Sequence, residues 1–178
     1  MVNAFWLDRD PDLTARWLVD RHVLSSVFEC SMVLTTAAQQ NGYAEDDPDA
    51  RDDLYFTHPN HPLTRWAAAH RGNWDALREY TEFAHDEWKR RWDHPPEKVH
   101  GSWETVESLD SEAVAALDWP GEPSDPPQVT GGWHADDYVD AYRLYYANEK
   151  RHLFEWSGGR SAPPWIDEYA RPEAPAGE

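Results

Sequence analysis

A long helical run near the N-terminus constrains the fold of this chain more than any other feature. Apolar side chains recur at helical spacing from about Asp12 to Gln40, and Asn41-Gly42 then ends the pattern. Asp10 followed by Pro11 is typical of a helix start, because an aspartate caps free backbone N–H groups and proline suits the first turn. The run predicts either one long helix or two helices that meet near Asp20.

The rest of the chain carries further helical patterns between Pro- and Gly-rich breaks. We expect helices over about 62–71, from 73 to about 92, over 104–117 and over 135–156, with loops over 44–60 and 119–132. The apolar residues 2–7 predict a short extended piece, either a strand or an arm packed on the helices. The sequence therefore predicts an all-α fold: a compact single-domain helical bundle over residues 1–170, with a disordered tail over 171–178.

Composition limits the class of protein. A length of 178 residues fits one domain, and eleven Trp, eight Tyr and five Phe supply enough apolar surface for a packed core. The formal net charge is -18, and only three of the 16 basic residues are lysines. This pattern is typical of adaptation to high salt, so we expect a halophilic, archaeal or viral protein. The acidity weakens a nucleic-acid hypothesis, although molar salt would screen much of the repulsion.

Cysteine use and hydropathy give expectations about location. The single cysteine, Cys30, rules out an internal disulfide and fits a reducing cytoplasm. There is no signal peptide and no apolar run of eighteen residues. We therefore expect a soluble, cytoplasmic protein with no membrane partner.

His22 and Glu29 are the leading candidates for chemistry. They are seven residues apart in the predicted first long helix, which places them on one face about 10 Å apart. A partly buried glutamate has a raised pKa and suits general acid–base catalysis. Two interpretations stay open: the two side chains are polar groups of the core whose hydrogen bonds are all made, or they are part of a functional site.

Two other groups of residues could contribute to a site. His58 and His61 could ligate a divalent metal together with His22 and Glu29; alternatively, His61-Pro62 begins a helix and the imidazole caps it. The prediction is no metal and no cofactor, with this set as the weaker alternative. The aromatic and basic run over 142–146, with Lys150, could stack bases and bind phosphates, or it could be a core stripe with basic residues at its edge.

Familiar nucleotide and hydrolase motifs are missing from the sequence. It has no Walker loop, no dinucleotide-binding fingerprint, no paired Cys-x-x-Cys and no Gly-x-Ser-x-Gly. This argues against a P-loop enzyme, a Rossmann dehydrogenase and an α/β-hydrolase.

Scattered positions along most of the chain resemble a known set of proteins. The segments are 7–11, 20–23, Glu29, His61-Pro62 with Trp66, Asn73-Trp74, 142–146 with Lys150, and Pro164-Trp165. They look like small uncharacterised proteins of tailed viruses and microbes. Within that set, the His-to-Glu spacing resembles the pyrimidine-dimer DNA glycosylases of the T4 endonuclease V type. Those proteins carry an Asp-x-His motif and a catalytic Glu on their first long helix, and a Lys on their last.

The resemblance implies an all-helical, cofactor-free DNA glycosylase and lyase. The N-terminal α-amine would attack C1′ of the damaged nucleotide and form a Schiff base. Here the amine would belong to Val2 after removal of Met1, Glu29 would act as the acid–base, and His22 would support it. Residues implied in substrate binding are His61, Trp66, Asn73, Tyr142, Arg143, Tyr146 and Lys150. The chain departs from the family in its acidity and in having Phe28 and Cys30 beside Glu29, where the family has arginines.

Two other classes of function compete with this one. The first is an enzyme that acts on a nucleotide or modified base as a small substrate, with or without a metal at the His/Glu site. The second is a non-catalytic accessory protein whose aromatic face binds a protein partner. DNA or a nucleotide is the expected partner of both the glycosylase and the small-substrate enzyme. The oligomeric state stays open.

Overall fold

The computed structural model describes residues 4–171 and confirms an all-α fold, with no strand in that range. None of the helices in this part of the chain has the length and apolar character needed to span a bilayer. The elements are α1 (Pro11–Trp17), α2 (Asp20–Gln40), α3 (Pro48–Asp52), α4 (Pro62–Ala69), α5 (Arg71–Arg91), α6 (Gly101–Glu107), α7 (Ser111–Ala115), α8 (Tyr138–Glu149) and the 3-10 turn η1 (Arg151–Leu153).

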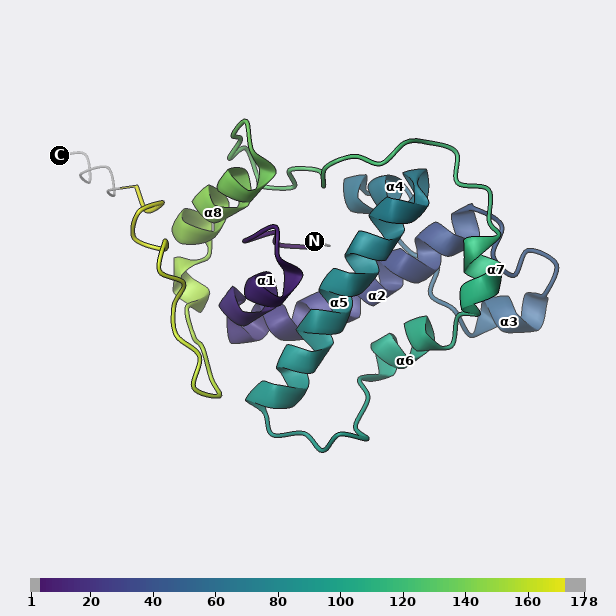
Figure 1. Cartoon of the computed structure of the whole chain (residues 1–178), viewed down its shortest axis with the longest axis horizontal. Coiled ribbons are helices and arrows are strands. Elements are labelled where there is room, and N and C mark those ends of the chain that lie inside the picture. The colour runs from purple at the N-terminus through teal and green to yellow at the C-terminus, as the bar shows by residue number, and fades with distance from the viewer. Residues whose placement is uncertain (1–3, 172–178) are drawn as a thin grey trace.

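The two longest helices, α2 and α5, form the centre of the molecule. They cross each other, and α1, α4 and α6 pack around them, as Figure 1 shows. One hydrophobic cluster runs through all of these elements and into α8, so the described helices share a single core. The predicted break near Asp20 is confirmed: α1 ends at Trp17, and the buried residues Leu18 and Val19 separate it from α2.

Other predicted helix boundaries differ from the structure for local reasons. The region 104–117 is divided into α6 and α7, because Asp110 accepts hydrogen bonds from the backbone N–H groups of Glu112 and Ala113 and starts a new helix. The last helix is shorter than predicted, since Asp137 caps its first turn and η1 follows Lys150. The loop over 44–60 contains the short α3.

The predicted N-terminal segment is a buried arm, and the strand alternative is wrong. Residues 4–6 have no regular secondary structure, the Leu7 N–H closes a tight turn by donating to Phe5 O at 3.1 Å, and each of residues 4–7 is at most 4 % exposed. The Phe5 ring stacks on His22 of α2 at 4.2 Å between centroids, and it also contacts Tyr142, Tyr145 and Tyr146 of α8. The arm therefore lies between α8 and the central helices (Figure 1).

Trp6 makes the same kind of connection on the other side of the arm. Its ring packs against Trp66 of α4, Tyr80 of α5 and Tyr138 of α8. The Tyr80 hydroxyl accepts a hydrogen bond from the Phe5 N–H at 3.2 Å and pairs with the Ser26 hydroxyl of α2 at 3.0 Å. Phe5 and Trp6 are successive residues with different partners in the body, and each also contacts α8, so both join α8 to the body.

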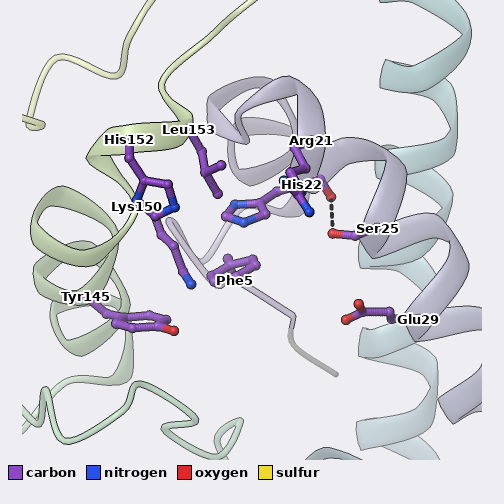
Figure 2. Close-up of a pocket in the computed structure, with 9 residues that line it drawn as sticks. All are labelled: Phe5, Arg21, His22, Ser25, Glu29, Tyr145, Lys150, His152 and Leu153. Carbon is purple, nitrogen blue, oxygen red and sulfur yellow. Dashed lines mark hydrogen bonds between the residues drawn. The ribbon is translucent and has the colours of Figure 1, made fainter. Parts of the chain in front are cut away.

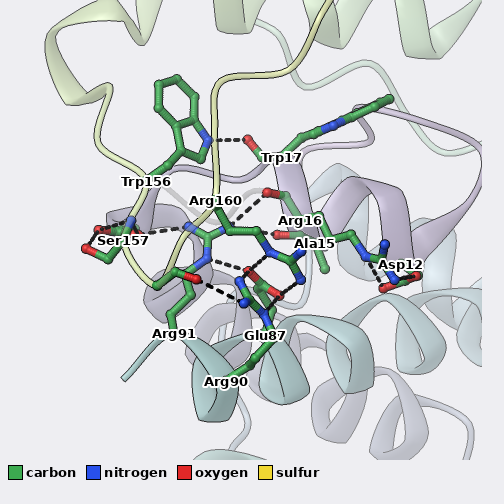
Figure 3. Close-up of polar contacts among 12 residues, drawn as sticks. Asp12, Ala15, Arg16, Trp17, Glu87, Arg90, Arg91, Trp156, Ser157 and Arg160 are labelled. Atoms are coloured by element: carbon green, nitrogen blue, oxygen red, sulfur yellow. Dashed lines mark hydrogen bonds and ion pairs between the residues drawn. The ribbon is translucent and has the colours of Figure 1, made fainter. Parts of the chain in front are cut away.

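A buried carboxylate, Glu87, holds the C-terminal segment against α5. It accepts hydrogen bonds from Arg90, Arg91 and Arg160, and Arg91 also reaches Asp20 at 2.9 Å (Figure 3). Glu87 is only 4 % exposed. Burial acts to raise its pKa, but the three arginine hydrogen bonds outweigh burial and lower the pKa to about 2. Glu87 is therefore ionised at neutral pH.

The predicted disordered tail, residues 171–178, lies almost wholly outside the described residues. Only Arg171 is described. Its N–H donates to Asn148 Oδ1 at 2.8 Å, and its guanidinium lies 4.7 Å from the Trp133 ring centroid. The prediction of disorder for 172–178 lies outside the described range.

Replacing Glu87 with Gln should destabilise the protein by about 3–5 kcal/mol, because three arginines would lose their shared buried counter-charge. Chemical denaturation at neutral pH measures this change. Glu82→Gln is the matched control on the same helix: Glu82 forms an exposed pair with Arg78 at 3.2 Å, so its loss should cost less than about 1 kcal/mol. Equal effects of the two substitutions would contradict the assigned role of Glu87.

Candidate functional site

A pocket of about 360 Å³ opens where α2, α8, η1 and the arm meet. It brings together three predicted site residues from distant parts of the chain: His22, Glu29 and Lys150. Figure 2 shows these side chains around one hollow, with Phe5 on its floor. The complete lining is Phe5, Arg21, His22, Ser25, Glu29, Tyr145, Lys150, His152 and Leu153.

His22 is a buried, oriented imidazole. Its Nδ1 lies 2.8 Å from the Tyr146 hydroxyl, which also accepts a hydrogen bond from the Val19 N–H at 2.8 Å. The phenol has one proton, and Nδ1 is the acceptor in reach. We infer that His22 carries its proton on Nε2. An N–H on Nε2 can donate to a ligand in the pocket.

The charge state of His22 follows from its surroundings. Burial lowers its pKa to about 3, and the positive charges of Lys150 and Arg21 add to that effect. The imidazole is therefore neutral at physiological pH and too weakly basic to take up a proton there. A neutral imidazole with its proton on Nε2 can donate a hydrogen bond, and Tyr146 holds the ring in position.

Glu29 provides the acidic wall of the pocket. It lies on the same face of α2 as His22, two turns further along, and is half-buried. Figure 2 shows its carboxylate directed into the hollow from the side opposite Lys150. This separation of charge allows a ligand to meet a carboxylate at one end and a cation at the other.

Lys150 is the lysine that lines the pocket, at the C-terminal cap of α8. Its Nζ lies 4.7 Å from the Tyr145 ring centroid and 5.9 Å from that of Phe5. Both are cation–π contacts, which hold the ammonium group without neutralising it. His152 of η1 lies beside Lys150, whereas Arg21 lines the pocket from α2, next to His22 (Figure 2). The pocket of this acidic chain, with a net charge of -18, is thus lined by two basic side chains, Arg21 and Lys150, as well as by Glu29.

Trp66 and Asn73 lie at a second pocket, of about 300 Å³, that Trp6 also lines. The Asn73 amide is already used on both sides, since Nδ2 donates to Trp66 O at 2.9 Å and Oδ1 accepts from Ser124 N at 3.1 Å. The Trp66 indole N–H donates to Ser124 O at 3.0 Å. These two residues fasten the Pro-rich loop to the helices.

Three residues of the predicted aromatic and basic run on α8 are structural. Tyr142 and Tyr146 are fully buried, and the Tyr142 hydroxyl donates to Pro127 O at 2.8 Å. Arg143 donates to Leu7 O at 2.8 Å and pairs with Asp8 at 2.9 Å. The alternative of a core stripe therefore describes these three residues, and only Tyr145 and Lys150 from this run reach the pocket.

The two loop histidines do not join this site. His61 Nδ1 accepts from the Leu63 N–H at 3.2 Å and so caps α4, as the helix-start alternative predicted. His58 Nδ1 pairs with the Thr57 hydroxyl at 2.7 Å. Over residues 4–171, no group of three or more His, Cys, Asp or Glu side chains is arranged to hold a metal ion. Val2, the predicted nucleophile, lies outside the described residues.

Sequence reasoning missed several pocket residues. Ser25 lies three residues after His22 and four before Glu29, so helical spacing places all three on one face and could have identified Ser25 as a pocket residue. Phe5 and His152 have no such signal, because they join the pocket only when the arm and the η1 turn pack against α2.

Comparison with known proteins gave no match: neither a family model, nor a curated protein, nor a solved structure is significantly similar to this chain. The resemblance to the pyrimidine-dimer glycosylases stays a prediction.

Replacing His22 with Gln should flatten the pH dependence of stability between pH 6 and 5. In the parent, His22 takes up a proton in this range only on unfolding, because its folded pKa is about 3; stability therefore falls as the pH falls. Without this histidine, unfolding no longer takes up that proton. The fall in the free energy of unfolding between pH 6 and pH 5 should therefore be smaller by about 1 kcal/mol. Urea denaturation at both pH values measures it.

His152→Gln is the control for this experiment, since His152 is an exposed residue of the same pocket. The slope of His22→Gln should be flatter than the slope of this variant. If His22→Gln also kept the parental slope, His22 would titrate equally in the folded and unfolded states, and the neutral-donor role would be wrong.

Proposed function

We propose that the pocket between α2, α8 and the arm is the active site of a DNA-base-acting enzyme of the glycosylase and lyase type. One observation carries the proposal: a half-buried Glu29, a neutral His22 and the ammonium group of Lys150 line a single hollow. An acid–base group, an oriented donor and a cation are the parts that cleavage of a glycosidic bond beside a phosphate requires.

In the proposed reaction, an amine is the nucleophile and Glu29 transfers the protons. An uncharged amine attacks C1′ of the nucleotide, and the base leaves with the electron pair of its C1′–N bond. Glu29 transfers protons between the amine, the sugar and the departing base. Loss of the amine proton and opening of the sugar ring then give an imine, and hydrolysis of the imine regenerates the amine.

The remaining side chains would bind the substrate. His22 Nε2–H donates to an oxygen of the sugar, and Lys150 and Arg21 pair with the adjacent phosphate. The α-amine of Val2 is the nucleophile that the family resemblance implies, and Val2 is three residues before Phe5 in the sequence. Lys150 Nζ is the amine that the pocket itself presents.

A small-substrate enzyme is the second candidate, favoured by the size of the pocket. A volume of about 360 Å³ suits a ligand of nucleotide size. The net charge of -18 also opposes a long polyanion more than it opposes a single nucleotide. The same Glu29, His22 and Lys150 would then act on a free nucleotide or modified base.

Borohydride trapping on DNA with an abasic site or a pyrimidine dimer tests the proposal. The untagged protein should form a covalent adduct, and Glu29→Gln should reduce the yield at least tenfold while leaving the fold unchanged by circular dichroism. Glu82→Gln, an exposed glutamate on α5, is the control and should react like the parent.

The position of the adduct identifies the amine. Proteolysis of the trapped protein and sequencing of the modified peptide assign Val2 if the adduct is at the N-terminus, and Lys150 if the adduct is at that side chain. Absence of an adduct from every DNA at every salt concentration would exclude the lyase. Turnover of free nucleotides that depends on Glu29 would then support the small-substrate alternative.

A further inference from the structure

One wall of the pocket is a short piece of chain that is fastened at both ends to the start of α2. It consists of Lys150 and η1, which we call the bridge, and it lines the pocket with Lys150, His152 and Leu153. Helix α2 carries His22 and Glu29 on the facing wall (Figure 2). The attachments of the bridge to α2 therefore set how the two walls face each other.

Val19 and Asp20, at the start of α2, make the two attachments. Before the bridge, the Tyr146 hydroxyl of α8 accepts a hydrogen bond from the Val19 N–H at 2.8 Å. After the bridge, Glu155 O accepts from the Asp20 N–H at 2.9 Å. The Asp20 carboxylate also accepts from the Ser157 N–H at 2.9 Å and from the Ser157 hydroxyl. Asp20 thus holds the far end of the bridge through both its backbone and its side chain.

The Asp20 carboxylate is an ionised and largely enclosed acceptor. Its side chain is 13 % exposed, and the buried Arg91 of α5 donates to its Oδ1 at 2.9 Å. Burial acts to raise the pKa of Asp20, but the hydrogen bonds from Ser157 and Arg91 outweigh burial and lower the pKa. Hydrogen bonds to an ionised acceptor are roughly twice as strong as those between neutral groups. The bond to Ser157 is therefore a firm attachment.

We propose that Asp20 is the positioning residue of the pocket. It holds the bridge against α2, so that Lys150 faces His22 and Glu29. Asp20 is not among the residues that line the pocket, and it acts through the bridge. Its effect on chemistry rests on the proposed function, in which the two facing walls supply the acid–base group, the donor and the cation.

NMR of methylated lysines reports where the bridge lies. Reductive methylation with ¹³C-formaldehyde labels lysine side chains and keeps their charge, and the chain has only Lys89, Lys98 and Lys150 to label. Lys150 Nζ lies 4.7 Å from the Tyr145 ring centroid. The ring current should therefore shift the Lys150 methyl signal upfield of the other two lysine signals. Loss of that shift means that the bridge has moved.

Three substitutions of Asp20 should give a graded result. Asp20→Asn keeps an oxygen for the Ser157 N–H and Arg91, and its amide can donate to the Ser157 hydroxyl, so the upfield shift should remain. Asp20→Ala removes the side-chain bonds and should reduce the shift. Asp20→Pro also removes the N–H that bonds Glu155 and should abolish the shift. Helix α2 should persist in this variant, because proline suits the first helical position and Val19 already has an extended backbone.

Arg160→Gln is the matched control in the same C-terminal segment. Arg160 donates to Glu87 Oε1 at 2.8 Å, further along the chain from the bridge (Figure 3). Between Arg160 and the bridge, Gly158 O accepts from Arg90 Nη1 at 3.0 Å. Loss of Arg160 should therefore lower stability while leaving the bridge in place, and the Lys150 signal should keep its upfield shift.

Borohydride trapping with the unmethylated variants measures the effect on the reaction. Asp20→Pro should lower the adduct yield by about 10- to 100-fold, since small displacements of reacting groups are costly. Asp20→Asn should recover most of the yield. Circular dichroism of each variant checks that the helices are intact.

Three results would overturn the role of Asp20. They are a parental Lys150 signal in Asp20→Pro, an equal loss of the upfield shift in Arg160→Gln, and a parental adduct yield in Asp20→Pro. If the parent forms no adduct but Asp20→Pro loses the upfield shift, the proposed reaction fails and the positioning of the bridge by Asp20 stands.

Discussion

Burial of the N-terminal arm is the interaction on which the rest of this structure depends. Helices α2 and α5 pack directly on each other, but α8 meets them largely through Phe5 and Trp6. Complete burial of a large aromatic side chain contributes roughly 2–3 kcal/mol, and the arm buries two in succession. It also places Phe5 at the bottom of the candidate pocket, so the element that closes the core also shapes the site.

The distribution of arginines explains how an acidic chain keeps a cationic pocket. Arg91, Arg143 and Arg160 are used internally, where they neutralise Glu87, Asp20 and Asp8 and tie distant segments together. Removing a buried counter-charge is costly, so these arginines are not available to a ligand. The basic residues that line the pocket are instead Arg21 and Lys150.

Local patterns in the sequence predicted much of this fold. The Asp10-Pro11 start, the break near Asp20 and the end at Asn41-Gly42 all depend on neighbouring residues, and the structure contains each of them. The joint placement of His22 and Glu29 on one wall follows from helical spacing alone. The roles of Asn73 and Tyr142 did not follow, because their partners, Ser124 and Pro127, lie in a loop with no periodic pattern. The pocket itself is a tertiary feature made by segments more than 100 residues apart.

That separation has a consequence for the order of events during synthesis. Phe5 is synthesised well before its partners Tyr145 and Tyr146, which lie more than 100 residues further along the chain. Contacts of such long sequence separation form late and slow the folding of a domain. Before α8 is made, the arm can pack only on α2, α4 and α5, and the contacts of Phe5 and Trp6 with α8 stay unmade. A nascent chain that lacks α8 and η1 can hold its central helix pair but not the pocket, because residues of those two elements line it.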